Sequence, residues 1–323
     1  MSCYEHLSIE ERENLLVKLK LGQNISQISR ETGRNRSTIW REIQRNSRSR
    51  DAYSAIGAQA QYEKRRENSV RPEKLTAPEC VYVVEKLLQS YWSPEQISYR
   101  LKRENSAIQI GVTTIYRGLE KGLPDASCRK NLRIKSRQRK GGRKKSKCGH
   151  LNIDRTIHDR ATSVEKRKKM GHWESDTVRG AKWSGCVATH VERKSRFAVL
   201  CKIPNRSAKE FTDATIATFA RLQPGKCKSL TVDHGKEFAQ HRRIAGDLKC
   251  KVYFADPYAP WQRGTNENTN GLLRQYLPKR TSFAELTQED VDRIADMLNK
   301  RPRKCLDWKT PHEVFFGKLL HLT

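Results

Sequence analysis

Residues 230–277 read LTVDHGKEFAQHRRIAGDLKCKVYFADPYAPWQRGTNENTNGLLRQYL. The β-branched run at 230–232 predicts a short buried strand that ends on Asp233. A His-Gly pair then turns the chain toward a helix predicted over 236–248. We therefore expect a carboxylate at the exit of a buried strand.

The second half of this stretch predicts another strand and a late helix that carries Glu267. The apolar run at 252–254 stops at a proline-containing loop, and a helix is expected over 264–278. On a 3.6-residue period Glu267, Asn270 and Arg274 share one face, and mainly apolar side chains occupy the other. The apolar face can then lie on a sheet while Glu267 points along its edge.

Carboxylates on separate rigid elements suit metal-assisted phosphoryl transfer, because Mg²⁺ bound to hard oxygen ligands neutralises phosphate charge. A third acid should precede these two, and Asp176 in the strand-like segment 173–178 is the best candidate. Two more strands are expected at 186–191 and 197–203. Solvated surface groups are the alternative, since most Asp and Glu are exposed. The predicted catalytic and metal-binding residues are Asp176, Asp233 and Glu267.

The charge of the chain indicates its partner. Its 323 residues allow two or three domains, and 65 Lys and Arg against 36 Asp and Glu give a net charge of +29. Such a basic protein binds a polyanion by releasing counterions, with an affinity that falls steeply with salt. The sequence has no apolar run of transmembrane length and no basic amphipathic anchor, so double-stranded DNA is favoured over a membrane.

Cysteine usage predicts a reducing compartment. The nine cysteines are an odd number without any C-x-x-C pair, which favours neither a disulfide framework nor a zinc ribbon. Cys148 and His150 lack two further spaced ligands, so we expect no metal site there. The polar N-terminus has no signal-peptide core. A cytoplasmic location is expected.

A helix-turn-helix is predicted near the N-terminus. A capped helix over 25–32 ends at Gly33, and a further helix follows over 38–45. Ser29, Gly33 and Ile39 have the spacing that lets two helices approach around a left-handed turn. The alternative is a plain three-helix bundle with a solvated basic face. The side chains expected to face a major groove are Arg34, Arg36, Ser37, Thr38 and Arg41.

A second candidate DNA-binding module follows. The segment 93–96, Ser-Pro-Glu-Gln, predicts a capped helix with proline at its first position, and another helix is expected to start at Thr113. The candidate DNA contacts here are Thr113, Thr114 and Arg117. Because this module lacks the turn glycine of the first, a purely structural helical pair is the alternative.

Basic residues dominate from 121 to 147, and such a run cannot bury a core. We predict a flexible linker that follows DNA phosphates, with a solubilising tether as the alternative. The predicted domains are a helix-turn-helix at 1–48, a helical linker with a second helix-turn-helix at 49–122, a basic flexible linker at 123–156 and an α/β catalytic domain at 157–323.

Four blocks carry a family resemblance: GHWESDTVRG, TVDHGKEFA, DPYAPWQRGTNENTNGLLRQYLPKRT and LNKRPRKCLDWKTPHEVF. They resemble the catalytic core of bacterial DDE transposases of the insertion sequence thirty family, and the match covers essentially the whole chain. The third block is the most specific, because Trp, Gly, Asn and Pro occur in a fixed order. His234 stands where the family usually has Asn, and His172 and Ser175 replace a common Asp and Gly.

The resemblance implies a ribonuclease H-like α/β core behind all-α helix-turn-helix modules. It implies that water frees 3′ hydroxyls at the terminal inverted repeats of a mobile element, and that these hydroxyls then attack target DNA. Our hypothesis is that the acids bind two Mg²⁺, with Mn²⁺ as a substitute. Synapsis of two ends predicts a homodimer or higher oligomer. A bacterial DNA enzyme is also expected to associate with the nucleoid.

Aromatic and basic residues near the acids are further candidates. Trp261 and Tyr258 could stack on bases unpaired at the cut, or they could pack inside the protein. Arg263 and Arg274 are expected to clamp phosphates beside Glu267. Either DNA contact or a solvated face is expected for the late basic group Arg301, Arg303 and Lys304.

Two other functions are also consistent with the predicted helix-turn-helix. One is a site-specific nuclease that cuts without joining. The other is a transposase-derived DNA-binding repressor without catalysis. The repressor has no use for three acids at these positions, so the acids separate it from the enzymes.

Overall fold

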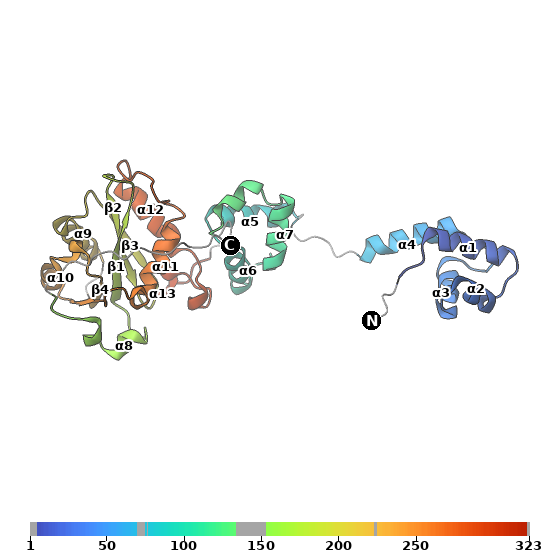
Figure 1. Cartoon of the computed structure of the whole chain (residues 1–323), viewed down its shortest axis with the longest axis horizontal. Coiled ribbons are helices and arrows are strands. Elements are labelled where there is room, and N and C mark those ends of the chain that lie inside the picture. The colour runs from blue at the N-terminus through green and yellow to red at the C-terminus, as the bar shows by residue number, and fades with distance from the viewer. Residues whose placement is uncertain (1–4, 70–74, 76, 134–152, 223–224, 322–323) are drawn as a thin grey trace. The chain divides into compact units, whose positions relative to one another are not determined.

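The chain divides into two compact units, Met1–Glu73 and Lys74–Thr323. They are described separately below (Figure 1). Most of the predicted basic linker, including Cys148 and His150, lies outside the described residues. The computed structural model describes residues 5–69, 75, 77–133, 153–222 and 225–321.

The first unit contains the predicted helix-turn-helix. Its helices are α1 (Ile9–Lys20), α2 (Ile25–Thr32), α3 (Arg36–Asn46) and α4 (Ala55–Ser69). Ser8 and Asn24 each close a capping box, at the start of α1 and α2. Gly33 ends α2 with φ 68°, a left-handed conformation that costs glycine nothing because it has no Cβ. Buried Ile28 and Ile39 then join α2 to α3, and α4 packs against α1.

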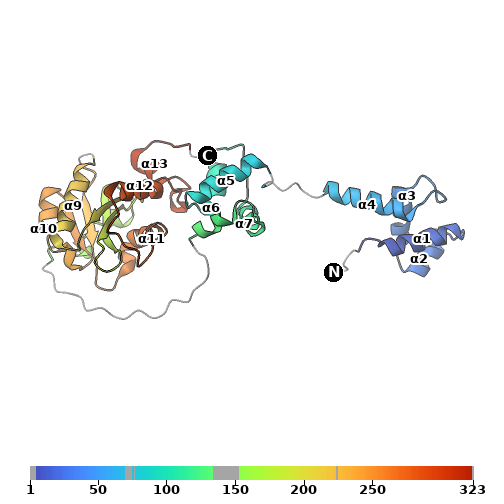
Figure 2. The ribbon, with the colours of Figure 1, turned by 90° about the horizontal axis from the view of Figure 1, so that it is seen from above.

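The second unit begins with three helices that share one apolar core. They are α5 (Pro78–Gln89), α6 (Pro94–Arg103) and α7 (Val112–Lys121), drawn in cyan and green in Figure 2. Val84, Ile97 and Ile115 are fully buried between them. The predicted capping box of Ser93 opens α6. Gly111 caps α7, which starts one residue before the predicted Thr113.

A five-stranded mixed sheet forms the rest of this unit, as the resemblance implied. Its spatial order is β3-β2-β1-β4-β5. β1 pairs antiparallel with β2 and parallel with β4, while β2–β3 is antiparallel and β4–β5 is parallel. The strands are β1 (His172–Arg179), β2 (Cys186–Glu192), β3 (Ala198–Ile203), β4 (Ser229–Val232) and β5 (Lys251–Phe254).

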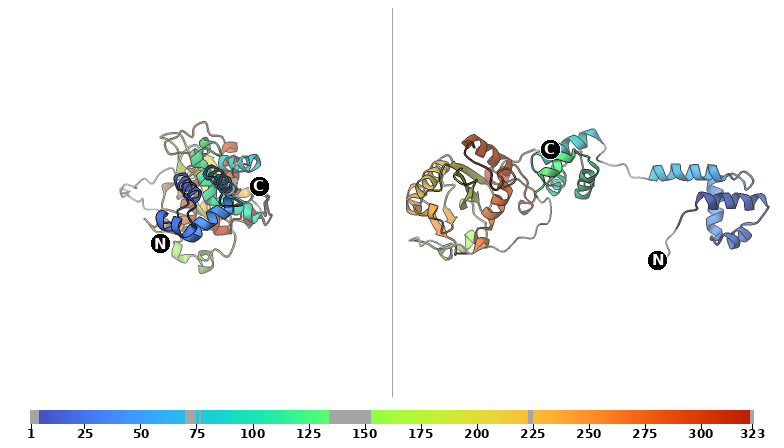
Figure 3. Two further views of the ribbon diagram at one scale, coloured as in Figure 1. Left: turned by 90° about the vertical axis from the view of Figure 1, so that its right-hand side faces the viewer. Right: turned by 45° about the horizontal axis from the view of Figure 1, so that its top comes forward.

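Helices cover both faces of the sheet (Figure 2 and Figure 3). Side chains alternate along β2, so Ala188 joins the apolar cluster of Phe211 and Val187 joins that of Leu272. One face carries α9 (Ala208–Ala220) and α10 (His241–Asp247), and the other carries α11 (Gly264–Leu273) and α12 (Gln288–Asn299). Short elements complete the unit: α8 (Thr162–Glu165), α13 (Pro311–Phe316) and the 3₁₀ turns η2 (Ala126–Asn131), η3 (Ile157–Asp159), η4 (Lys236–Phe238), η5 (Pro260–Arg263) and η6 (Lys304–Leu306).

Two helix predictions were wrong in extent. The helix predicted over 236–248 is split into η4 and α10, because Gln240 has φ −91° and ψ 29°, outside the helical region. The helix predicted over 264–278 ends at Leu273. Proline at 278 cannot continue a helix and disfavours helical backbone in the residue before it.

Candidate active site

Asp176 lies on β1, and Asp233 directly follows the neighbouring parallel strand β4. In the pairing of β1 with β4, Glu174 lies opposite Thr231. Two residues further along each chain, the same register places Asp176 opposite Asp233. Residues two apart on a strand share a face, so both carboxylates emerge at this position of the sheet.

Arg263 lies between the two carboxylates. Its Nη2 is 2.8 Å from Asp233 Oδ2, and its Nη1 is 3.6 Å from Asp176 Oδ2. The same Nη1 donates to the Ser175 carbonyl at 3.1 Å. Burial raises the pKa of Asp176, Arg263 opposes the rise and the charge of Asp233 adds to it. The two carboxylates therefore share the positive charge of the Arg263 guanidinium.

The helix α11 contacts Asp176 and also carries Glu267. Asn270 on α11 donates its Nδ2 to Asp176 Oδ2 at 3.0 Å. Glu267 is three residues earlier on the same helix, and Cβ atoms at this spacing are about 5–6 Å apart. Glu267 is exposed, whereas Leu272 and Leu273 are buried, so the apolar face of α11 lies on the sheet as predicted.

A buried polar network that the sequence analysis missed anchors α11 to β1. The backbone N–H of Asn266 donates to Glu174 Oε2 at 2.9 Å, and its side-chain amide donates to the Glu174 carbonyl at 3.0 Å. Arg193 pairs with Glu174 Oε1 at 2.6 Å. Strand alternation was a usable signal, because Glu174 is two residues from Asp176 and shares its face.

A fourth acid, Glu237, lies nearby but is already satisfied. It is buried and accepts from Thr177 Oγ1 at 2.9 Å and from Arg206 Nε at 2.6 Å. These partners fix the carboxylate in place and already neutralise its charge. Glu237 is therefore a poorer metal ligand than the exposed Glu267.

Gly235→Ala is expected to lower catalysis by about 10–100-fold, an effect typical of disturbing the groups that orient metal ligands. Gly235 donates its N–H to Asp233 Oδ1 at 2.8 Å. A Cβ here would clash with Glu237 Oε2 and lie 2.9 Å from Asp233 Oδ1. DNA cleavage and thermal unfolding should both be measured. The variant Gly246→Ala, where a Cβ meets nothing within 4 Å, is the control. Equal activities of the two variants would contradict this role.

The donor set suits a hard divalent cation, because carboxylate oxygens are its preferred ligands. Among the described residues, no three His, Cys, Asp or Glu side chains are yet arranged around one ion. Arg263 supplies the positive charge between two of the acids, and Glu267 faces outward. In this structure the positive charge beside the two aspartates is therefore the Arg263 guanidinium.

The predicted DNA-contact face of α3 is partly committed to other contacts. Arg36, Ser37 and Arg41 are exposed and Thr38 is half-buried. Arg34 instead forms a two-pronged ion pair with Glu11, through Nε at 2.8 Å and Nη2 at 3.0 Å. A 52% exposed Trp40 lies on α3, and the sequence analysis did not single it out.

On α7, Thr113 and Arg117 are exposed and Thr114 is half-buried. Tyr116 between them is 45% exposed and is a further candidate that was missed. Threonine, arginine and tyrosine side chains on an exposed helix face can all donate hydrogen bonds to DNA.

The aromatic and basic candidates near the acids differ in their surroundings. Trp261 is 75% exposed, so its ring does not pack in the core. Arg274 donates to the carbonyls of Arg179 and Leu277, at 2.9 and 3.3 Å. Arg301 and Arg303 of the late basic group are buried, so the prediction of a solvated face was wrong for these two residues.

Comparison with known proteins agrees with the fold of the two domains. The family described as Integrase core domain matches residues 166–260, and the family described as Helix-turn-helix domain matches residues 3–46. The chain is 39% identical over 322 residues to the transposase InsI of insertion sequence element IS30A from Escherichia coli K12, covering 96% of this chain and 83% of that protein. The chain belongs to the IS30 family of transposases.

Two other relatives also match this transposase over nearly its whole length. The transposase of element IS1086 from Cupriavidus metallidurans is 36% identical, over 99% of this chain and 97% of that protein. The transposase of element IS4351 from Bacteroides fragilis is 35% identical, over 96% and 95%. The transposase thus combines a helix-turn-helix domain with a ribonuclease H-like core of the polynucleotidyl transferase type. Within the described residues, no helix has the length and apolar character needed to cross a membrane.

Proposed function

We propose that this transposase binds the terminal inverted repeats of an insertion sequence, cleaves the DNA to free 3′ hydroxyls and joins them to target DNA. The observation that carries the proposal is the carboxylate pair of Asp176 and Asp233, set side by side in the sheet register with Arg263 between them. Two carboxylates this close repel each other unless a cation lies between them. A cation at this position would also stabilise the negative charge that develops on a reacting phosphate ester.

Asp176, Asp233 and Glu267 are the residues that would hold two Mg²⁺, with Mn²⁺ as a substitute. Bound there, the ions would supply the charge that stabilises attacking and leaving oxygens in an in-line displacement. Asn270 and the N–H of Gly235 keep the two aspartates oriented, through hydrogen bonds of 3.0 and 2.8 Å. Arg263, once released from the acids, is positioned to bind a phosphate oxygen.

One site serves both reactions because only the nucleophile differs. In cleavage, a water oxygen forms a bond to phosphorus while the bond from phosphorus to the 3′ oxygen breaks, and that oxygen leaves as a hydroxyl. In joining, the oxygen of this 3′ hydroxyl forms a bond to a target phosphorus while the bond from that phosphorus to the target strand's own 3′ oxygen breaks, and that oxygen leaves as a hydroxyl. The 75% exposed Trp261, on η5 directly before α11, can stack on bases unpaired at the cut.

DNA recognition is assigned to the exposed side chains of two helices. Arg36, Ser37 and Arg41 on α3 can reach a major groove, while Thr113 and Arg117 on α7 offer a second contact. Bringing two element ends together requires a homodimer or higher oligomer. A protein of net charge +29 that acts on chromosomal DNA is expected at the nucleoid.

The experiment that tests this function is strand transfer with the full chain and a duplex that carries a precut element end. We expect joined product in Mg²⁺ or Mn²⁺ and none in EDTA, because the acids alone repel phosphate. Uncut ends should first be nicked under the same conditions. Cleavage without joining would identify a nuclease, and specific binding with neither reaction would identify a repressor.

A further inference from the structure

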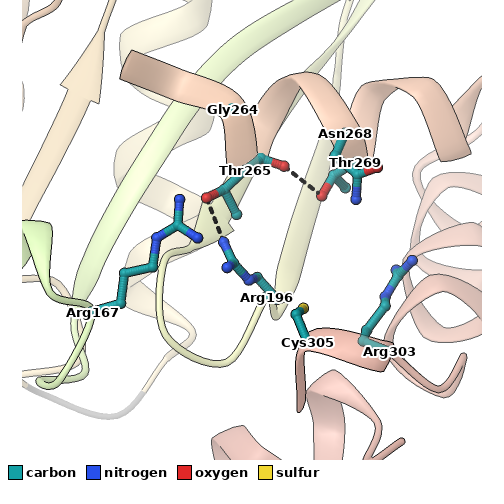
Figure 4. Close-up of a pocket in the computed structure, with 8 residues that line it drawn as sticks. All are labelled: Arg167, Arg196, Gly264, Thr265, Asn268, Thr269, Arg303 and Cys305. Atoms are coloured by element: carbon teal, nitrogen blue, oxygen red, sulfur yellow. Dashed lines mark hydrogen bonds between the residues drawn. The ribbon is translucent and has the colours of Figure 1, made fainter. Parts of the chain in front are cut away.

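A pocket lined by basic residues lies beside α11, the helix that carries Glu267. It is a pocket of about 160 Å³ at the start of α11 (Figure 4). Arg167 and Arg196 reach it from the loops before β1 and β3, and Arg303 reaches it from the segment before η6. The remaining lining residues are Gly264, Thr265, Asn268, Thr269 and Cys305.

This pocket is separate from the acids. Successive residues of an α-helix are rotated by about 100°. Thr265 and Asn268, which line the pocket, therefore lie on the side of α11 opposite Glu267 and Asn270. A ligand in the pocket would touch the helix that carries Glu267 without entering the catalytic site.

The three arginines lack acidic partners. Among the described residues, none of them forms an ion pair, and the nearby Glu165 and Glu174 pair with Arg160 and Arg193 instead. Three guanidinium groups around one cavity repel one another, so an anion is the missing partner.

Their hydrogen bonds also leave donors unused. Arg196 donates Nη1 to Thr265 Oγ1 at 2.6 Å, while its buried Nε has no partner. Arg303 is only 9% exposed, and its Nη2 donates to the Leu298 carbonyl at 3.0 Å. Burial, together with the charge of the neighbouring Arg301, lowers the pKa of Arg303 to about 9. An entering anion would favour the charged form.

We propose that this pocket binds one phosphate group of the DNA backbone, on the face of α11 opposite Glu267. A phosphate offers several acceptor oxygens in a geometry that guanidinium forks match, and the partial positive charge of a helix N-terminus adds to the attraction. The inference rests on the proposed action on DNA. It adds a contact that would hold the strand while α11 presents Glu267.

Cys305 provides a direct probe, because its exposed thiol lies at the pocket. Its alkylation by iodoacetamide, followed by peptide mass spectrometry in metal-free buffer, reports occupancy. Inorganic phosphate and a short duplex, each at about ten times its dissociation constant, should both slow alkylation about tenfold. Half-buried Cys227 serves as the internal reference.

Arg196→Gln is expected to remove both protections, and Arg221→Gln, which deletes an exposed charge directly after α9, should keep them. Circular dichroism checks that the variants fold, and the wild-type result stands even if Arg196→Gln does not. The proposal is overturned if neither ligand protects, if only free phosphate protects, or if Arg196→Gln leaves protection by duplex unchanged. Strand transfer that persists without protection would leave the proposed function intact and remove only this pocket.

Discussion

Asp233→Asn is expected to abolish excision of an element from a plasmid, with a loss of about 10³-fold or more. Cation-assisted charge stabilisation supplies several kcal/mol, and each 1.36 kcal/mol is a factor of about ten in rate. Asparagine is nearly isosteric and can still accept from Arg263, which lies 2.8 Å from the aspartate. The change therefore removes a metal ligand with little disturbance of shape.

Two measurements separate chemistry from structure in this variant. Binding of a duplex with the terminal repeat should stay within a few-fold of wild type, and so should the midpoint of unfolding. The control is Asp247→Asn, an exposed acid on α10 whose loss removes the same charge. Unchanged excision in Asp233→Asn would rule out the metal mechanism, and lost DNA binding would point to a structural role.

Arg100→Gln is expected to destabilise the second unit by about 3–5 kcal/mol, the usual cost of breaking a buried ion pair on one side. Arg100 on α6 forms a two-pronged bond with Glu313 on α13, with both N–O distances at 2.7 Å. The side chains of both residues are 2% exposed. Loss of the guanidinium would leave the buried Glu313 without its cation and would also remove the ion pair of Arg100 with Glu104. Urea unfolding followed by tryptophan fluorescence measures the effect.

The matched control is Arg103→Gln, one turn further along α6. Arg103 pairs with Asp307, whose side chain is 82% exposed, so its loss should cost no more than about 1 kcal/mol. If Arg100→Gln and Arg103→Gln have equal effects, the buried pair does not hold α6 to α13.

The same pair predicts how stability depends on pH. Arg100 and two backbone N–H groups overcome the effect of burial and lower the pKa of Glu313 to about 2, from an ordinary 4.5. A depressed folded-state pKa stabilises the fold fully above the unfolded value, so this contribution is present above about 4.5 and is lost as pH falls toward 2. The difference in unfolding free energy between wild type and Glu313→Gln should shrink over that range.

Local signals in the sequence predicted all five strands and several of the helices, although they did not predict α5. Apolar and β-branched runs predicted all five strands, and capping residues predicted the starts of α2 and α6. These signals work because periodicity and caps depend on residues within one turn or one strand. They were weaker at helix ends: the helices around Gln240 and before the proline at 278 are shorter than predicted.

The sequence by itself determined which acids are candidates, because Asp233 follows a buried strand and Glu267 lies on the polar face of a helix. Only the tertiary structure decided how they are supported. Arg263 between the two aspartates, Asn270 on Asp176 and the buried Glu174 anchor join segments 30 to 94 residues apart. The arginines behind α11 likewise come from three distant segments. Side-chain contacts between distant segments depend on strand order and helix packing, which no local pattern encodes.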